Sequence, residues 1–167
     1  EDLMEAVLHG SNSYPFQFYY EDLSVFDFNC IEWHWHTELE FIFIESGTVT
    51  LWIGEDRFNL TEGNGIFINT KVLHRLYSPS KAIIPNFVFM PSFIAPCDSL
   101  IYQKYILPII FSSLPFLVFH KKVCWQAKVL SIMRQIISAQ DSVLSKELLT
   151  NSLLQNLWLE IFDNTDI

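Results

Sequence analysis

Residues 34–44 read HWHTELEFIFI, so a group of histidines and carboxylates runs directly into a strongly apolar segment. In an extended chain, side chains two residues apart point to the same side. His34 and His36 therefore share one side, and Glu40 returns to that side if the strand continues beyond the bend between them. The apolar residues 41–44 predict a buried strand that ends before Gly47.

His74 follows a further predicted strand and a turn. If it lies on a facing strand, its side chain would be the fourth member of this group. Two imidazoles and a carboxylate on one side form a ligand set for Zn, Fe(II), Mn or Ni, and another imidazole from a facing strand would complete four ligands. The same groups could instead bind a polyol, because imidazole nitrogens donate and accept hydrogen bonds and a carboxylate accepts them. The sequence therefore predicts a ligand site at His34, His36, Glu40 and His74, occupied by a metal or by a sugar-like molecule.

The region from residue 25 to residue 91 reads as a series of about eight short strands, each apolar or alternating. Turns are predicted at Gly47, at Gly54 and at residues 61–65. Short strands at nearly regular spacing with glycine turns indicate an antiparallel sandwich or barrel.

Outside this region the apolar spacing is helical. Residues 2–9 show it first, and residues 98–106 show it again. Two longer segments, residues 125–137 and 145–162, carry wide apolar stripes, with a connection expected at Asp141-Ser142. These segments predict an antiparallel pair of helices at the end of the chain.

The composition is that of a globular domain with a strong acidic excess. Of the 167 residues, ten are Lys or Arg and nineteen are Asp or Glu, which gives a net charge of −9. Nucleic acid binding requires a basic face, so this chain by itself is not expected to bind DNA. We also expect reduced thiols at Cys30, Cys97 and Cys124, a cytoplasmic location and no membrane segment.

Two spacings in the chain resemble the two cupin motifs. The pattern His34-x-His36-x3-Glu40-x6-Gly47 matches the first motif, and Gly63-x10-His74 matches the second. Several positions depart from the family pattern. Phe28 stands where the first motif begins with Gly, and Asn69, Lys71 and Ser78 replace the Pro, Gly and Asn of the second.

A narrower resemblance covers about residues 3–162. Residues 33–40 and 62–75 are similar to the N-terminal sensor domain of AraC-type transcription regulators, and residues 99–108 match the segment after the barrel in that family. The resemblance implies a mainly β fold, with a cupin-like antiparallel barrel (a double-stranded β-helix) followed by the helix pair. It divides the chain into an N-terminal arm or short helix at 1–14, a cupin barrel at 15–120 and a helical dimerisation region at 121–167.

The function that this resemblance implies is effector sensing. A small molecule, expected to be a sugar, would bind in the barrel of a homodimer and control DNA binding by a helix-turn-helix half that this chain lacks. The resemblance implies no enzyme activity and no required cofactor, with a divalent transition metal as an optional occupant of His34, His36, Glu40 and His74. The residues expected at the dimer surface lie on the last helix: Leu149, Leu153, Leu157, Trp158 and Ile161.

Two other functions remain open for the same residues. One is a cupin metalloenzyme, an isomerase or dioxygenase, in which the four ligand residues hold a catalytic metal. The other is a stand-alone sugar-binding cupin with no role at DNA. These three hypotheses differ in turnover, in metal content and in the presence of a DNA-binding half.

Overall fold

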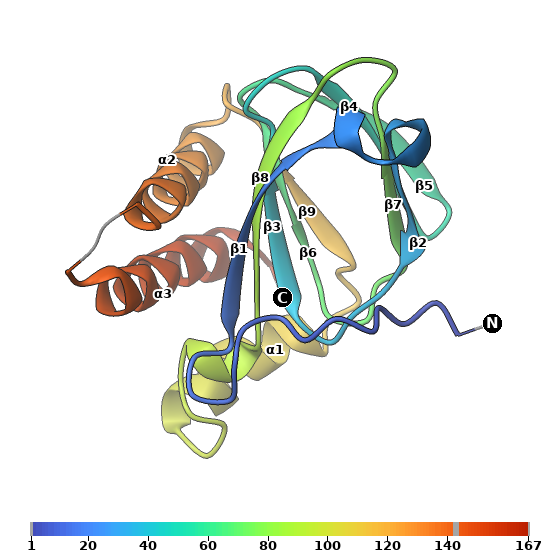
Figure 1. Cartoon of the computed structure of the whole chain (residues 1–167). Helices are drawn as coiled ribbons and strands as arrows, with labels where there is room; N and C mark the ends of the chain where they lie inside the picture. Colours follow the sequence, from blue (N-terminus) through green and yellow to red (C-terminus); the bar gives the residue numbers. More distant parts are fainter. Residues whose placement is uncertain (1, 142–143, 167) are drawn as a thin grey trace.

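The computed structural model describes residues 2–141 and 144–166 (Figure 1). The strands are β1 (Phe16–Asp22), β2 (Cys30–His34), β3 (Leu39–Phe43), β4 (Thr48–Ile53), β5 (Asp56–Thr61), β6 (Gly65–Ile68), β7 (His74–Tyr77), β8 (Ile83–Phe89) and β9 (Phe116–Phe119). The helices are α1 (Leu107–Ile110), α2 (Cys124–Ala139) and α3 (Lys146–Asn164). Shorter helical turns are η1 (Leu23–Val25), η2 (Asp27–Asn29), η3 (Pro91–Phe93) and the π-helical η4 (Tyr102–Ile106).

The strands form two antiparallel sheets that face each other. One sheet has the order β1-β8-β3-β6-β9 and the other has the order β2-β7-β4-β5. Helices α2 and α3 pack together on the outer face of the five-stranded sheet, and the barrel interior lies on its other face (Figure 1). The predicted antiparallel barrel with a trailing helix pair is therefore confirmed.

Strand β3 separates two hydrophobic cores because its side chains alternate between the two faces of the sheet. Leu39, Phe41 and Phe43 belong to an aromatic core shared with the helices. Ile42, with Ile44 just beyond the strand, belongs to an aliphatic core inside the barrel. Glu40 has the same parity as Ile42, so it points into the barrel, as the spacing of the histidines and Glu40 predicts.

The helix pair closes the aromatic core. Leu157, Trp158 and Ile161 of α3 are buried there, and the indole nitrogen of Trp158 donates a hydrogen bond of 2.9 Å to the backbone oxygen of Tyr105. These three residues, predicted at the dimer surface, are thus buried in the core of their own chain. Of the other two, Leu153 is partly buried against the same core and Leu149 is 40% exposed.

The predicted connection between the long helices falls between Ala139, where α2 ends, and Lys146, where α3 begins. Its second residue, Ser142, lies outside the described residues. No helix in residues 2–141 and 144–166 has the length and apolar character needed to cross a bilayer.

The prediction of a helix at residues 2–9 is wrong. This segment is extended and runs across the end of the barrel (Figure 1). Its backbone pairs with Trp35, whose NH donates to Leu3 at 3.1 Å and whose oxygen accepts from Glu5 at 2.9 Å. A single eight-residue helix is marginal in water, so pairing with a distant part of the chain determines the conformation.

Candidate functional site

The four predicted ligand residues come together at one end of the barrel. His34 ends β2 and lies directly opposite His74, which begins β7. Glu40 reaches the same place from β3, and His36 comes from the bend between β2 and β3. One ligand atom from each of the four side chains lies within 4.8 Å of the others. The sequence spacing thus identifies a real three-dimensional cluster.

Each of the three imidazoles in this cluster has its tautomer fixed by the backbone. A carbonyl oxygen can only accept a hydrogen bond, so a ring nitrogen beside it must carry the hydrogen. The contacts are from Nδ1 of His34 to Glu32 O at 2.8 Å, from Nδ1 of His36 to Glu38 O at 3.1 Å, and from Nδ1 of His74 to Val72 O at 2.8 Å. In each neutral ring the lone pair is therefore on Nε2, the nitrogen left for a ligand.

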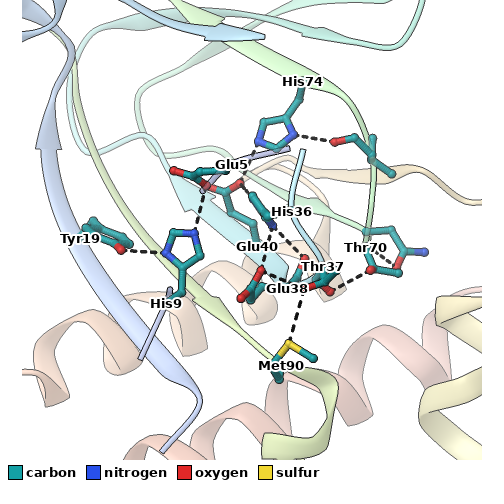
Figure 2. A network of polar contacts seen from close by, with 12 residues as sticks. Glu5, His9, Tyr19, His36, Thr37, Glu38, Glu40, Thr70, His74 and Met90 are labelled. Atoms are coloured by element: carbon teal, nitrogen blue, oxygen red, sulfur yellow. Dashed lines mark hydrogen bonds and ion pairs between the residues drawn. The ribbon is translucent and has the colours of Figure 1, made fainter. Parts of the chain in front are cut away.

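The carboxylate of Glu40 lies beside the free nitrogens of His36 and His74 (Figure 2), and the ligand atom of His34 is within 4.8 Å of the same group. Oε2 of Glu40 is 3.2 Å from Nε2 of His36 and 3.1 Å from Nε2 of His74. The second nitrogen is fully buried, and no hydrogen bond of normal geometry satisfies it within the described residues. Lone pairs of neutral rings repel a carboxylate, so this arrangement needs either protons on the rings or a cation between the groups.

The electrostatics of the cluster agree with this requirement. Burial would raise the pKa of the Glu40 carboxyl, but the imidazoles of His36 and His74 outweigh burial and hold this pKa well below its usual range. Burial lowers the pKa of His36, but the carboxylates of Glu40 and Glu5 and the hydrogen bond to the Glu38 backbone together raise this pKa above its ordinary value. Burial and the neighbouring His74 lower the pKa of His34. Glu40 is therefore ionised, and His34 favours the neutral form that binds metals.

These residues fit a divalent transition metal. Three imidazole nitrogens and one carboxylate oxygen are a donor set that suits Zn, Mn, Fe(II) or Ni. The unsatisfied nitrogen of His74 is a specific sign of fit, because a buried polar atom normally has a partner. A bound ion there would act as a Lewis acid toward an oxygen of a small molecule.

The loop before His74 has a backbone conformation that glycine favours, although a lysine stands at that position. Lys71 stands at a motif glycine and has φ of 60°, in the left-handed region. Its backbone NH donates to the oxygen of His36 at 2.8 Å, which ties the loop to the ligand group. Phe28, at the other replaced glycine, also has a positive φ of 58°. At both replaced glycine positions the backbone therefore adopts the left-handed conformation that glycine favours.

A cavity of about 150 Å³ adjoins the cluster and is lined by His34, His36 and Glu40. The fully buried His74 lies behind this wall. The rest of the barrel wall is partly aliphatic, with Ile31, Ile42, Leu76, Ile84 and Val88, and partly polar, with Tyr19, Glu21 and Asn86. Sequence reasoning missed the polar wall residues, because strand register decides which side chains face inward.

The N-terminal segment closes one side of the cavity. Glu5, Val7 and His9 line it, and His9 is almost completely buried. Nδ1 of His9 lies 2.8 Å from the hydroxyl of Tyr19, and its Nε2 lies 3.0 Å from a carboxylate oxygen of Glu5 (Figure 2). The ring also meets His36 edge-on, with centroids 5.7 Å apart. We refer to residues 2–9 as the arm.

Comparison with known proteins agrees with this architecture. Residues 30–85 match the Cupin domain family. A relative from Bacillus subtilis (strain 168), the uncharacterized HTH-type transcriptional regulator YdeC, is 26% identical over 145 residues, which cover 81% of this chain and 47% of the relative. The chain thus spans about half the length of this curated relative.

Two solved structures are similar to this chain to different extents. ToxT from Vibrio cholerae O395 aligns with a TM-score of 0.59 and 12% identity, over 91% of this chain and 56% of ToxT. A cupin-2 domain containing protein from Shewanella frigidimarina has a TM-score of 0.39 and 21% identity, over 48% of this chain and 74% of that protein. Residues 30–85 thus match the Cupin domain family, as the two motif spacings predict, and most of the chain is similar in sequence to an HTH-type transcriptional regulator and in fold to ToxT.

Proposed function

We propose that this chain is the effector-sensing and dimerisation part of a cytoplasmic AraC-type transcription regulator. The observation that carries the proposal is the cavity beside His34, His36 and Glu40, in a chain whose curated relative is a transcriptional regulator. Donor groups that converge on an internal cavity are typical of a small-molecule site. DNA binding would belong to a further domain, since this chain carries a net charge of −9.

The arm supplies a way for an occupant to be sensed. Glu5 and His9 line the same cavity as the ligand residues, so a molecule there contacts the arm and the barrel together. Such a molecule favours the arrangement in which the arm is closed over the cavity. A ligand shifts an equilibrium only through different affinities for the two states. Arm contacts that exist in one state alone provide that difference.

Metal binding at the four ligand residues is part of the proposal. The lone pairs on Nε2 of His34, His36 and His74 converge with the Glu40 carboxylate, and this supports a divalent transition metal held by all four. When bound, the ion supplies a coordination position for an oxygen of the effector. The remaining cavity wall then determines which effectors fit.

The volume of the cavity limits the size of the effector that can bind with the arm closed. An apolar cavity of this volume in another protein binds benzene, so about six non-hydrogen atoms fill it. A monosaccharide is larger. We therefore propose a compact effector with the arm closed, and a sugar as effector requires displacement of Glu5, Val7 and His9.

Dimerisation is proposed through the exposed face of α3. Leu148 and Leu159 are 76% and 53% exposed, and Leu149 lies beside the first of them. Leu148 and Leu159 are about three helical turns apart, so they share one face of the helix. Analytical ultracentrifugation of Leu148→Asp and Leu159→Asp should show monomers where the unmodified chain is a dimer. A monomeric unmodified chain, or dimeric variants, would contradict this surface.

The test of the whole proposal uses the full-length protein of the native gene and DNA from its own promoter region. We expect fluorescence anisotropy to give a dissociation constant that changes when an effector found by thermal-shift screening is added. His36→Ala, which alters the cavity, should remove the response, and His120→Ala, at an exposed histidine, should retain it. Binding to the promoter that ignores every stabilising small molecule would refute effector sensing.

A metalloenzyme is the second candidate, and the set of four metal-type ligands, three of them buried, is what favours it. It requires product formation that depends on the metal and is lost in Glu40→Gln. A screen of small oxygenated substrates with the metal-loaded protein separates the two functions. Turnover without any effect on DNA binding would favour the enzyme, whereas an effect on DNA binding without turnover favours the regulator.

A further inference from the structure

The cavity has a second polar region, away from the four metal-type ligands. Glu21 on β1 pairs with Ile84 of β8, whereas Glu40 on β3 pairs with Val88, four residues further along β8. The two carboxyl-bearing positions are therefore about 13 Å apart along the strand direction. Both side chains line the same cavity. The cavity thus has a metal-ligand end and a separate end formed by Glu21.

Glu21 is held by Asn86, a side chain that is 3% exposed and also lines the cavity. The amide nitrogen of Asn86 donates to a carboxylate oxygen of Glu21 at 2.7 Å and to the backbone oxygen of Ile84 at 3.1 Å. Within the described residues, no hydrogen bond reaches the amide oxygen of Asn86. Two acceptors, the Glu21 carboxylate and the amide oxygen of the buried Asn86, therefore meet at this end of the cavity.

The charges of the cavity wall are unbalanced at Glu21. Glu5 is paired with His9, and Glu40 lies between His36 and His74. For Glu21 no cationic partner occurs among the described residues, and the cavity lining there contains neither Lys nor Arg. Burial, together with the charges of Glu40 and Glu5, raises the pKa of Glu21 to about 7.

A cation in the cavity removes this imbalance better than a neutral molecule does. An ammonium group donates several hydrogen bonds and can reach both acceptors at once. A charged donor on a carboxylate also gives a stronger bond than a hydroxyl does. An anion, in contrast, would add a like charge near the half-buried carboxyl of Glu21, which has no cationic partner among the described residues. The wall therefore selects against anionic groups at this end.

We propose that Glu21, positioned by Asn86, recognises a protonated amino group of the effector. The ligand class is a compact amine that also carries an oxygen for the metal-ligand end, which is the chemistry of an amino alcohol. This inference rests on the proposed function, because it takes the cavity as the effector site. It adds the chemical class of the effector and the residue that specifies it.

The experiment compares three probes that share a hydroxymethyl group and differ in the second group: ethanolamine, ethylene glycol and glycolate. Isothermal titration calorimetry should show ethanolamine as the tightest of the three, both with metal and with EDTA. Glu21→Gln should weaken ethanolamine roughly tenfold or more and leave ethylene glycol unchanged. Glu55→Gln makes the same chemical change at an exposed turn and should have no effect.

Glu21→Asp keeps the charge and should retain the preference for ethanolamine over ethylene glycol at lower affinity. Thermal unfolding shows whether each variant is folded before it is titrated. Failure of ethanolamine to bind the folded, unmodified chain, equal affinity in Glu21→Gln, or tighter binding of glycolate would overturn the inference. Promoter binding is read separately. If ethanolamine binds through Glu21 without altering promoter binding, the proposed function fails and the amine site stands.

Discussion

Nε2 of His74 lies 3.1 Å from Oε2 of Glu40, and the hydrogen on this ring is engaged elsewhere, at Nδ1. The pair therefore requires an extra proton or a metal ion to be stable. Whether a metal ion is present can be decided by measuring the number of metal ions bound per chain.

Metal binding should depend on each imidazole of the cluster. We expect the chain to bind one Mn or Zn ion, and His74→Ala to weaken binding by roughly 100-fold or more because one of four donors is lost. Competition against a chromogenic chelator measures the affinity, and elemental analysis gives the stoichiometry. His120→Ala, at an exposed site, is the matched control. Unchanged metal content in His74→Ala would exclude this site.

The bound metal should also stabilise the fold in a pH-dependent way. A ligand that binds the folded state at 100 times its dissociation constant adds about 2.7 kcal/mol of stability. Acid removes this gain, because the imidazoles of His34, His36 and His74 must lose protons to bind a metal. Thermal unfolding with Zn and with EDTA should therefore differ clearly at pH 7.5 and little at pH 5.5. An equal shift at both pH values would contradict binding through imidazoles.

Glu21 should make the protein less stable as the pH rises. Its pKa is about 7 in the folded chain against an ordinary value of 4.5, so the folded state binds more protons between these values. Stability then falls through this window and the penalty is complete above it. Because Glu21 is partly exposed, we expect a reduced effect, on the order of 1–2 kcal/mol.

Glu21→Gln tests this directly, because it keeps the shape and removes the charge. The variant should be more stable than the unmodified chain at pH 8 and similar to it at pH 4.5, as measured by urea unfolding. Glu55→Gln should show no such trend. Greater stability of the unmodified chain at pH 8 would mean that Glu21 has a cationic partner in solution.

The two residues that replace motif glycines should carry conformational strain. Phe28 and Lys71 have φ of 58° and 60°, and both are exposed, so little packing is lost on truncation. Phe28→Gly and Lys71→Gly should each stabilise the chain by about 0.5–1 kcal/mol. Gly63→Ala, at φ of 84°, should have the opposite sign. Thermal unfolding measures all three, and destabilisation by both glycine variants would show that the strain is absent.

The arm should open when its buried histidine is removed. His9 makes two side-chain hydrogen bonds, and the arm backbone protects the amide of Trp35 through its bond to Leu3. His9→Ala should therefore speed hydrogen exchange at Trp35 while exchange at core amides such as Phe41 stays slow. Unchanged protection of Trp35 would mean that the arm is held by its backbone alone.

Local sequence patterns are sufficient to predict much of the structure of this chain. Alternation across His34, His36 and Glu40 predicts the shared side of the ligand group, and helical spacing predicts α2 and α3. Strand alternation and helical spacing can both be recognised from residues that are close together in the sequence. They also require no knowledge of which distant segment lies alongside.

The features that local patterns miss depend on partners far along the chain. The arm has helical spacing, yet it is extended because its hydrogen bonds go to Trp35. Glu21 and Asn86 face the cavity through the register of β1 and β8, which composition does not reveal. The apolar stripe of α3 likewise predicts burial correctly, but the partner of Trp158 is the chain's own sheet, including Phe67.

Strand β3 has one further consequence. Glu40 stands in the ligand group, and its immediate neighbours Leu39 and Phe41 stand among the residues that seat the helix pair. The ligand group and the core beneath the helix pair are thus one peptide bond apart. If the proposed effector binds at Glu40 and shifts β3, the residues that contact the helices would shift with the same strand, without a long relay of intermediate residues.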